Sequence, residues 1–553
     1  MLECGHKAKE AAFALAQKTL LPILAIDPSA LSTHRIQVLC VATPEEAVLI
    51  EVEKTPGLVD LLHLAKPFGA YDAKAVHHAL LKTLGAAPHR WASVQTSALL
   101  LAGGRRIDLT LPSLMRVHGL PAPPDPSAGL DALANYARSL ANLLHLQGEA
   151  IKHHAMQHVS RIEALAVAPI VAMEYHGMPF DAVAWQQQSA ETALLQKELG
   201  KKLAQLLDLG ETNLWGEVST HLNDDEALRH ALFAKGFSVP NVRKSTLATL
   251  PDPIGPLLRH YRELFKLTTT YGENFLSHVA ADGRVHPTFE QIGTSTGRLS
   301  CHSPNLQAMV KGASQRACFR VQPHRRLVIG DYATCELRIL AGMSGDPIFT
   351  KAFLEGADLH ALVAGQMFGK RVSRVENPDL RERAKAINFG LCYGMGAAGL
   401  ARTIEAPLPQ AEALLKQYFK TFPKIGGFLE SSAKKALERG FASTVTGRRL
   451  YFDGVTTSTH RLQFERVAKN MPIQGTSADM TKLALARVHA ALSVFQEAFL
   501  VNTVHDELVV ECHEKDAQDV AVVLEREMKE AGAEVIQSVP MAVDVVISEA
   551  WNK

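Results

Sequence analysis

The 553-residue sequence lacks several features that mark specialised proteins. Its seven cysteines include no CxxC pair, so neither a zinc site nor a disulfide framework is predicted, and we expect a reducing compartment such as the cytoplasm. No apolar run is long enough to span a membrane, and the N-terminus shows no signal or transit pattern. The net charge of +1 excludes a strongly basic protein, although a neutral chain can still carry a local basic cleft.

The chain is too long for a single core, and its composition is that of an ordinary globular protein. With 553 residues, 47% hydrophobic and 21% charged, it predicts three or four structural units. Residues 1 to about 160 mix short apolar strands with helical stretches, which predicts an α/β domain. From about 165 to 292, helical periodicity dominates. Two apolar stripes are predicted to face a core, Leu195, Leu199, Leu203 and Leu206 on one helix and Leu257, Tyr261, Leu264 and Leu267 on another.

Two aspartates lie at the ends of apolar runs that are typical of β-strands. Asp331 follows Leu327, Val328 and Ile329, and Asp506 lies between two apolar runs in AFLVNTVHDELVVEC. If the two turns meet, two like charges need a cation between them, and Mg²⁺ binds through one or two carboxylates plus phosphate oxygens. For either segment alone, a solvated turn is the simpler interpretation.

Between these two segments, RERAKAINFGLCYG predicts a helix with one chemically distinct face. Arg381, Lys385, Phe389 and Tyr393 recur every fourth residue, so they form a slowly rotating stripe of two cations followed by two aromatic rings. Such a face suits a nucleoside triphosphate, with cations on the phosphates and rings against the sugar and base. The spacing alone does not separate this from a solvated basic face with Phe389 in the core.

Five ordered motifs together resemble the family A DNA polymerases, the group of bacterial DNA polymerase I and its Klenow fragment. They are TSTGRLS (294–300), DYATCELR (331–338), RERAKAINFGLCYG (381–394), NMPIQGTSAD (470–479) and VHDEL (504–508). The resemblance extends from about residue 165 to the C-terminus and is weaker before that. Five motifs in order are far more specific than any one of them.

The resemblance implies a multidomain α/β and α+β fold, a right-hand polymerase of palm, fingers and thumb. We expect a ribonuclease-H-like 3′-5′ exonuclease-type domain at 1–160, a thumb at 161–292, a palm at 293–349 and 441–553, and fingers at 350–440. On the thumb, Arg259, Arg262 and Lys266 share a face that could follow a DNA backbone. The expected partners are primer-template DNA and dNTPs, the cofactor is a pair of Mg²⁺ ions that Mn²⁺ can replace, and the expected form is a monomer.

Residue roles follow from the matching motif positions. The implied metal ligands are Asp331, Asp506 and the backbone carbonyl of Tyr332, with Glu507 as an accessory carboxylate; Arg381, Lys385 and His360 are implied for the triphosphate, and Phe389 and Tyr393 for the nucleotide. Lys385 is also the implied proton donor to pyrophosphate. Arg298, Asn470 and Gln474 are implied minor-groove contacts, and Arg466 and His505 are implied primer-strand contacts. Minor-groove acceptors are nearly alike for all base pairs, so such contacts test pair shape without choosing sequence.

Glu336 carries the inference that the product is DNA. In the resembling enzymes this position lies beneath the sugar and leaves no room for a 2′-hydroxyl. The chain departs from the family at 333–335, where Ala-Thr-Cys replaces the usual Ser-Gln-Ile. This change leaves template contact and fidelity open, but not the chemistry.

The N-terminal domain is expected to lack exonuclease activity. Its first motif reads Asp27, Pro28, Ser29 where Asp-x-Glu is needed, and Leu140 follows Tyr136 at the spacing where the family has aspartate. The second motif places Val76 or Asp72 at the aspartate, depending on register. So few carboxylates cannot compensate the charge of two metal ions. A 5′-nuclease domain is also expected to be absent.

Two other function classes compete with this interpretation. A single-subunit RNA polymerase shares the paired aspartates and the lysine-bearing helix, but Glu336 and the motifs TGRLS and NMPIQG argue against it. A non-catalytic DNA-binding scaffold is disfavoured because Asp331, Asp506, Arg381 and Lys385 are all present. His154 and His158, at i and i+4, lack a third ligand and are interpreted as surface residues.

Overall fold

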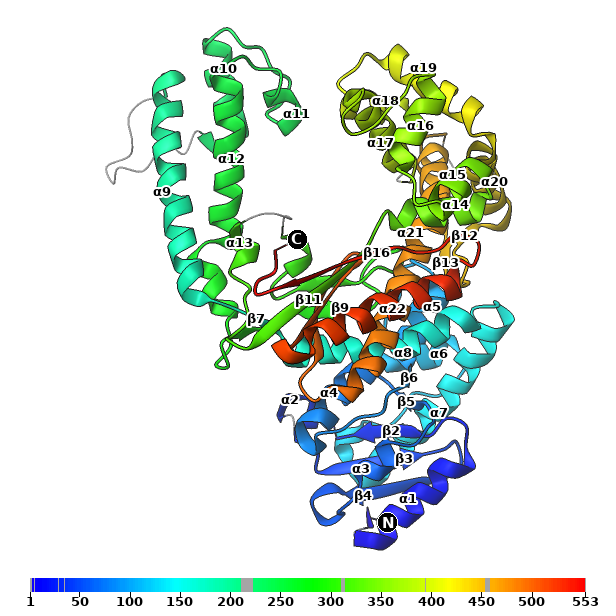
Figure 1. Cartoon of the computed structure of the whole chain (residues 1–553). Coiled ribbons are helices and arrows are strands. Elements are labelled where there is room, and N and C mark those ends of the chain that lie inside the picture. Colours follow the sequence, from blue (N-terminus) through cyan, green and yellow to red (C-terminus); the bar gives the residue numbers. More distant parts are fainter. Residues whose placement is uncertain are drawn as a thin grey trace. The chain divides into compact units, whose positions relative to one another are not determined.

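The computed structural model describes residues 2–3, 5–27, 29–33, 35–209, 222–309, 314–392, 394–452 and 458–552 (Figure 1). The chain divides into two compact units. The first comprises Met1–Gly177, Pro287–Gln307 and Val328–Ile547, and the second comprises Met178–His286, Ala308–Leu327 and Ser548–Lys553. Each unit therefore combines segments that are far apart in the sequence.

The N-terminal part of the first unit is a six-stranded sheet in the order β1-β4-β3-β2-β5-β6. The strands are β1 (Leu2–Glu3), β2 (Ile23–Ile26), β3 (Val38–Ala42), β4 (Ala47–Glu51), β5 (Phe68–Ala70) and β6 (Trp91–Ser93). Strands β2, β3 and β4 pair antiparallel, whereas β5 pairs parallel with β2 and with β6. The α/β domain expected from the sequence is therefore present.

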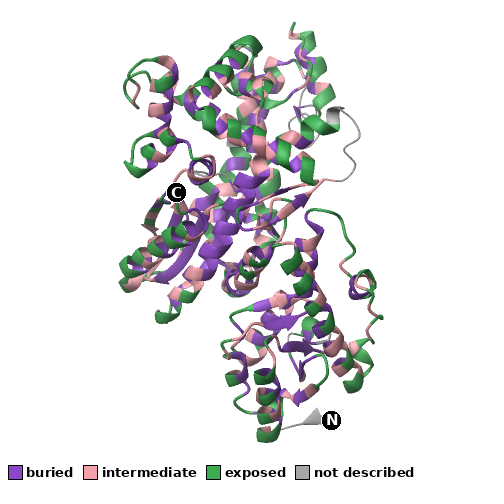
Figure 2. Ribbon diagram, turned by 90° about the vertical axis from the view of Figure 1, so that its right-hand side faces the viewer, coloured by how far each residue is buried: buried purple, intermediate pink, exposed green. Residues whose placement is uncertain are grey.

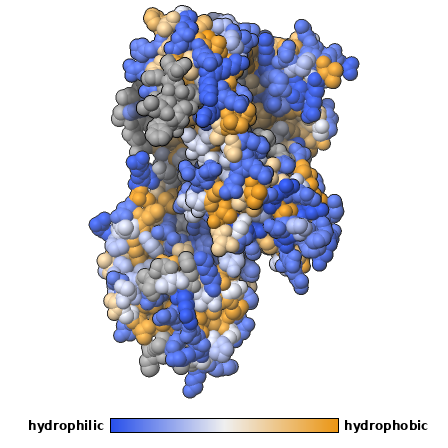
Figure 3. Space-filling view, turned by 90° about the vertical axis from the view of Figure 1, so that its left-hand side faces the viewer, coloured by the Kyte–Doolittle hydropathy of each residue, from blue (hydrophilic) through white to orange (hydrophobic). Residues whose placement is uncertain are grey.

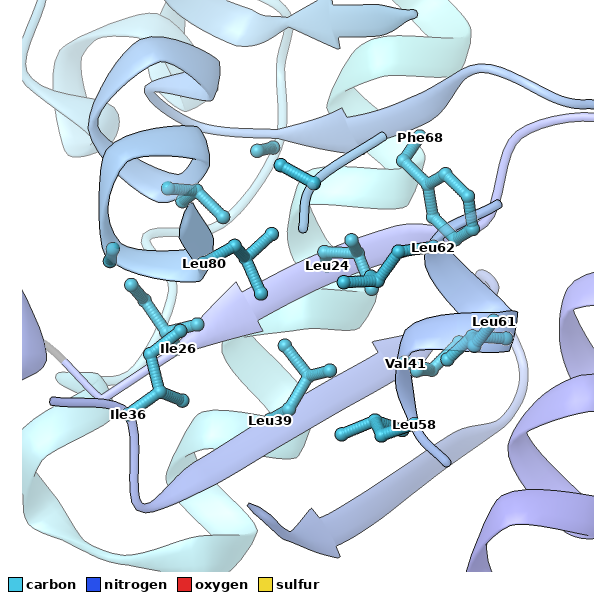
Figure 4. Packing of buried hydrophobic residues seen from close by; sticks show 14 of the residues in the cluster. Leu24, Ile26, Ile36, Leu39, Val41, Leu58, Leu61, Leu62, Phe68 and Leu80 are labelled. Atoms are coloured by element: carbon cyan, nitrogen blue, oxygen red, sulfur yellow. The ribbon is translucent and has the colours of Figure 1, made fainter. Parts of the chain in front are cut away.

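Helices cover both faces of this sheet, because successive side chains of a strand point to opposite faces. They are α1 (Gly5–Lys18), α2 (Ser29–Thr33), α3 (Val59–Leu62), α4 (Ala73–Leu84), α5 (Val94–Ala102), α6 (Leu111–Val117) and α7 (Leu130–His153). Leu24 and Ile26 of β2 pack with residues of α1, α3 and α4 (Figure 4). Ile23 and Ala25 pack on the other face with α5, α6 and α7. The short strand is buried on both sides, which explains its continuous apolar sequence.

A second sheet of the first unit has the order β14-β15-β11-β16. Its strands are β11 (Arg325–Tyr332), β14 (Phe499–Val504), β15 (Glu507–His513) and β16 (Val543–Ser548). The helices α8 (Gln157–His176), α21 (Ser458–Ala491) and α22 (Ala517–Val535) pack together beside it, and α8 also contacts β14. Figure 2 shows buried residues concentrated on the sheets and on the helices packed against them. Residues 471–486 of α21 are all buried or nearly so, including several polar ones.

A group of helices lies between β11 and α21 in the sequence of the first unit. They are α14 (Cys335–Ser344), α15 (Pro347–Leu354), α16 (Leu359–Phe368), α17 (Pro378–Cys392), α18 (Ala397–Thr403), α19 (Leu408–Thr421) and α20 (Pro423–Arg439). Helix α17 contacts α14, α16, α18 and α21. Two hairpins complete the unit, β9 (Thr288–Glu290) with β10 (Ser300–His302) and β12 (Phe441–Ser443) with β13 (Arg449–Tyr451).

The second unit consists mainly of helices. They are α9 (Ala182–Leu206), α10 (Asp225–Ala234), α11 (Lys244–Leu247), α12 (Ile254–Tyr271) and α13 (Ser314–Ala317), with β7 (Met178–Pro179) paired to β8 (Arg284–Val285). At one end the rings of Phe180, Trp185, Phe275 and Phe319 pack together in tilted, edge-to-face and stacked pairs, with centroids 4.4 to 6.3 Å apart. This aromatic core joins the helices to the segment that leads into β11.

The two apolar stripes predicted for these helices have different outcomes. On α12, Tyr261 and Leu264 are buried, and Leu257 packs against the same core, as predicted. On α9 the prediction is wrong at Leu195, which is 53% exposed. Leu203 is buried and Leu199 packs against the same core, as predicted, while Trp185 and Thr192 are buried without having been predicted. The pattern of leucines alone does not identify the buried face, because only the partner helix decides which residues are covered.

The surface carries the polar character expected from the composition. Figure 3 shows hydrophilic residues over much of one face, with hydrophobic ones in separate patches. Among the described helices, none has the length and apolar content needed to cross a membrane.

Candidate active site

The structure places Asp331 in β11 and Asp506 directly before β15, and these two strands are neighbours in the second sheet. Asp331 lies one residue before the end of β11, and Asp506 lies in the two-residue turn between β14 and β15, where Val504 pairs with Glu507. His505 accommodates this tight turn with a φ of 57°. The backbone N–H of Tyr332 donates to the carbonyl oxygen of Asp506 at 3.3 Å. The end of β11 and the β14–β15 turn therefore lie together, as a single site formed by both aspartates requires.

The donor atoms at this point suit a hard divalent cation. Asp331 and Asp506 offer carboxylate oxygens and Tyr332 a backbone carbonyl, which are the ligand types that Mg²⁺ prefers. Glu507 is buried beside them, and its carbonyl accepts a hydrogen bond from the Thr503 hydroxyl at 2.9 Å. Within the described ranges, no group of three or more His, Cys, Asp or Glu side chains is arranged to hold a metal by itself. Mg²⁺ does not need such a group, because substrate phosphates and water complete its coordination.

Glu336 forms an ion pair that sequence analysis did not predict. It lies in the first turn of α14, is 8% exposed, and accepts a hydrogen bond from Nη2 of Arg298 at 2.5 Å. Sequence analysis assigned the two residues separately, Glu336 to the sugar and Arg298 to the minor groove. The structure places these two side chains in direct contact.

The predicted nucleotide-facing stripe lies on α17 and divides into two parts. Lys385 and Phe389 line a hollow of about 580 Å³, together with Glu382 and residues 403–405. Arg381 instead donates to the Asp358 carboxylate at 2.9 Å and to Glu382 at 2.9 Å. The hydrogen bond with Asp358 raises the pKa of Arg381 above its usual value. Tyr393, the fourth member of the stripe, lies outside the described residues.

His360 is positioned close to this stripe from α16. Its Nδ1 lies 3.1 Å from the Asn388 side-chain nitrogen, and its ring centroid is 5.6 Å from that of Phe389. Burial, together with the charge of Arg381, lowers the pKa of His360 to about 4. His360 is therefore neutral at neutral pH.

Helix α21 carries three predicted DNA contacts. Asn470 and Gln474 are four residues apart and so share a face of the helix. Arg466 lies one turn before Asn470 and is exposed. The end of α17 approaches this turn closely, since a Cβ on Gly394 would lie 2.8 Å from the Arg466 carbonyl oxygen. His505, from the β14–β15 turn, is exposed and lines a cavity of about 20 Å³ together with Arg298. The structure thus brings residues from three motifs to one region of the first unit.

Comparison with known proteins decides the family. A family model described as DNA polymerase family A matches residues 186–553, which is more than half of the chain. The chain belongs to DNA polymerase family A.

Individual relatives agree with this assignment. The chain is 33% identical over 434 residues to a thermostable DNA polymerase I of Thermus caldophilus, covering 74% of this chain and 50% of the relative. It is 33% identical over 382 residues to DNA polymerase I of Caldicellulosiruptor bescii, covering 65% of this chain and 44% of the relative. The chain spans about half the length of these curated relatives.

A solved structure of the same kind supports the fold across nearly the whole chain. The POL domain of Pol1 from M. smegmatis, solved in complex with DNA primer-template and dNTP, matches with a TM-score of 0.81 and 25% identity. The match covers 96% of this chain and 95% of that chain. The expected polymerase architecture is thereby confirmed.

The chain also contains a buried charge cluster that its sequence did not predict. Glu163, Arg448, Asp479 and Lys482 form a buried group of two carboxylates and two cations. Asp479 lies in the NMPIQGTSAD motif, so its position was available from the sequence. Nothing in the sequence indicates that Glu163 and Arg448 are buried and paired, because a single charged residue on a mostly apolar helix or in a turn is usually exposed to solvent.

The residues of the predicted exonuclease motifs lie after a strand, at a helix cap and in the apolar core of the domain. Asp27 follows β2, and Asp72 caps α4 by accepting a hydrogen bond from the Ala75 N–H at 3.1 Å. Leu140 is 1% exposed and belongs to the apolar core of the domain, and Val76 is also buried. Burial raises the pKa of Tyr136, as do the nearby Tyr71 and Asp72. The position where the third motif needs a carboxylate is thus occupied by a core leucine.

Proposed function

We propose that the chain is a template-directed DNA polymerase that adds dNTPs to a primer 3′ end. The observation that carries this proposal is the contact between Tyr332 and Asp506, which joins the two motif aspartates at one edge of the sheet. Family membership supports it, and so does the match to a structure that holds DNA primer-template and dNTP.

The domains are proposed from the same resemblance. The four-stranded sheet with α21 and α22 corresponds to the palm, the helices between α15 and α20 to the fingers, and α9, α10 and α12 to the thumb. The N-terminal sheet corresponds to an exonuclease-type domain. Its strand order β4-β3-β2-β5-β6, antiparallel and then parallel, supports a ribonuclease-H-like relationship.

We propose that two Mg²⁺ ions bind at Asp331, Asp506 and the Tyr332 carbonyl. Mn²⁺ can replace them. When bound there, they supply charge stabilisation for the attacking and leaving oxygens of phosphoryl transfer. Asp331 is held by strand β11, and Asp506 is held by the tight two-residue turn between β14 and β15. Glu507, at the start of β15, is the proposed accessory carboxylate.

The proposed nucleotide site uses α17. Lys385, in the hollow beside Phe389, is placed to bind the triphosphate and to donate a proton as pyrophosphate departs. Arg381 supplies a fixed positive charge, and neutral His360 supplies a hydrogen bond. Glu336 is proposed to exclude a 2′-hydroxyl, since its carboxylate is buried and held by Arg298.

DNA is proposed to lie across Arg298, Asn470 and Gln474, with Arg466 and His505 on the primer strand. These side chains are neutral or positive, as contacts to an anionic duplex require. On α12, Arg259 and Lys266 line a hollow of about 590 Å³ and are further candidates for phosphate contact. Arg262 lines the same hollow but already donates to the Val242 carbonyl at 2.7 Å and pairs with Asp225.

The N-terminal domain is proposed to be a structural scaffold without proofreading activity. The support is Leu140, whose core position leaves no anionic ligand where the third motif needs one. The chain is further proposed to act as a monomer.

One primer-extension experiment tests the proposal. The purified protein is incubated with a primer-template, Mg²⁺ and either four dNTPs or four ribonucleotides. We expect extension with dNTPs and little with ribonucleotides. Extension with ribonucleotides alone would indicate an RNA polymerase, and binding without extension would indicate a scaffold.

A further inference from the structure

A fully buried ion cluster lies at the centre of the first unit. It comprises Glu163 of α8, Arg448 of the β12–β13 turn, and Asp479 and Lys482 of α21, all with side chains at most 4% exposed. Arg448 donates from Nε to Oδ1 of Asp479 at 2.8 Å and from Nη2 to Glu163, and Lys482 lies 2.5 Å from Glu163. Although burial opposes its charge, the two carboxylates raise the pKa of Arg448. The cluster is balanced in charge, and each of its ions is paired.

The loop of residues 291–298, which ends at Arg298, contacts this cluster at two points. At one end, Nε2 of Gln291 donates to the Glu163 carbonyl at 2.8 Å and to its carboxylate at 2.6 Å. At the other end, the Arg448 side chain packs against Gly297, where an added Cβ would lie 2.3 Å from Nε of Arg448. Gly297 has a φ of 84°, so glycine meets both the steric and the backbone requirement.

Internal hydrogen bonds make the loop a compact unit between these two points. Gly293 N–H donates to the Arg298 carbonyl at 3.2 Å, and Gly297 N–H donates to the Thr294 carbonyl at 3.0 Å. The Thr294 hydroxyl accepts from the Arg298 N–H at 3.0 Å. A displacement at Gln291 or Gly297 is therefore passed on to Arg298 rather than absorbed by a flexible segment.

The same cluster fixes α21, the helix that carries the other minor-groove residues. Asp479 accepts hydrogen bonds from the hydroxyls of Thr444, at 3.0 Å, and Thr446. The Thr476 hydroxyl accepts from the backbone N–H of Val445 at 3.2 Å. The β12–β13 turn is thus bound to α21 along the stretch that follows Gln474. Lys482 also lines the small cavity that contains Arg298 and His505.

We infer that Arg448 and Gln291 are positioning residues that set Arg298 relative to Asn470 and Gln474. This inference rests on the proposed function. A test of base-pair shape requires the three side chains to meet the minor-groove edges of both bases of one pair in a fixed geometry, because a displacement of about 1 Å can cost a hundredfold in rate. The planar guanidinium of Arg448 bonds two carboxylates in fixed directions, which a lysine cannot reproduce.

The decisive variant is Gln291→Met, because it removes the amide while leaving no buried charge unpaired. Single-turnover extension is measured from a matched and from a mismatched primer terminus. The wild type and each variant are assayed at the same number of degrees below their own Tm. We expect the matched rate to fall about tenfold and the mismatched rate to change little, so that discrimination falls about tenfold. The KM for dNTP should stay within about twofold, since Lys385 and Phe389 are untouched. Arg448→Lys should change discrimination in the same direction.

Two controls separate positioning from general stability. Glu527→Gln, on α22, removes the negative charge from a partly buried ion pair with Arg487 of α21 and should lower the Tm without changing discrimination. In an Arg298→Ala background, Gln291→Met should have no further effect, because its consequence passes through Arg298.

The inference is overturned if Gln291→Met and Arg448→Lys discriminate like the wild type. It is overturned equally if Glu527→Gln loses discrimination to the same extent, or if the effects of Gln291→Met and Arg298→Ala are additive. A wild-type protein that extends no primer would instead contradict the proposed function, and the inference with it.

Discussion

The backbone N–H of Tyr332 donates a hydrogen bond to the carbonyl oxygen of Asp506 at 3.3 Å. The two residues are 174 positions apart in the sequence. Because Tyr332 directly follows Asp331, this one bond brings both motif aspartates to the same edge of the sheet. The two side chains are therefore expected to act as one site.

The first prediction is that Asp331→Asn or Asp506→Asn abolishes primer extension, with a loss of at least about a thousandfold. Each substitution keeps the shape of the side chain but removes an anionic metal ligand. Primer-template affinity, measured by fluorescence anisotropy, should remain close to that of the wild type because the phosphate-contacting cations are unchanged. Substantial extension by either variant would contradict the proposed metal site.

The second prediction concerns sugar selection by Glu336. Glu336→Ala should open space for a 2′-hydroxyl and raise ribonucleotide use relative to dNTP use by about tenfold to a hundredfold. Glu336→Gln keeps the side-chain volume but loses the ion pair with Arg298, so it should retain most of the selectivity. The measurement is the ratio of kcat/KM for the two nucleotides. Equal ratios in Glu336→Ala and the wild type would place the selectivity elsewhere.

The third prediction is that Asp358→Asn lowers the KM for dNTP by about two- to fivefold. Although burial opposes its charge, the hydrogen bond from Arg381 lowers the pKa of Asp358, so its carboxylate competes with phosphate for Arg381. Asn caps helices as well as Asp does, so the hydrogen bond from Ala361 N–H to residue 358 should survive. Steady-state kinetics measure the effect. A raised KM would show that Asp358 orients Arg381 instead of competing for it.

The fourth prediction is that the protein has no 3′-5′ exonuclease activity. A 3′-labelled mismatched primer-template is incubated with protein and Mg²⁺ or Mn²⁺ in the absence of dNTPs, and we expect no shortening. Leu140 lies in the apolar core and Asp72 is used as a helix cap, which leaves too few anionic ligands. Shortening that disappears in an Asp27→Ala variant would show that other carboxylates complete the site.

The fifth prediction is a loss of stability in acid that arises from His77. Burial, with smaller contributions from His489, His78 and His89, lowers the pKa of His77 to about 3, and its Nδ1 accepts from the Trp91 indole N–H at 2.9 Å. Below its ordinary pKa of about 6.5, the unfolded chain binds a proton that the folded chain excludes. Stability is therefore fully present above that pH and falls as the pH drops, by about 2 kcal/mol at pH 5.

The variant His77→Asn tests this acid dependence. Its side-chain oxygen can accept from Trp91 but does not titrate in this range. Denaturant unfolding at pH 8 and pH 5 should show a smaller difference between the two conditions for the variant than for the wild type. Equal differences would mean that other groups cause the acid sensitivity.

The local sequence predicted where several candidate site residues lie on strands and helices, because these residues belong to short motifs. Asp331 at the end of an apolar run, and Lys385 and Phe389 one helical turn apart, follow from strand and helix periodicity. The leucine stripe of α9 shows where periodicity is insufficient. Leu195 is exposed because the packing of α9 against α12, rather than its own pattern, determines which side is covered.

The sequence by itself determined the fold family and which polar and charged side chains its motifs supply. Only the tertiary structure decided which charges meet. Arg298 and Glu336, Asp358 and Arg381, and Glu163 with Arg448 and Lys482 are separated by 23 to 319 positions in the chain. Hydrophobic burial brings such groups together without regard to sequence distance, and once buried each charge requires a partner. The partner is therefore a property of the packed core and cannot be read from a local pattern.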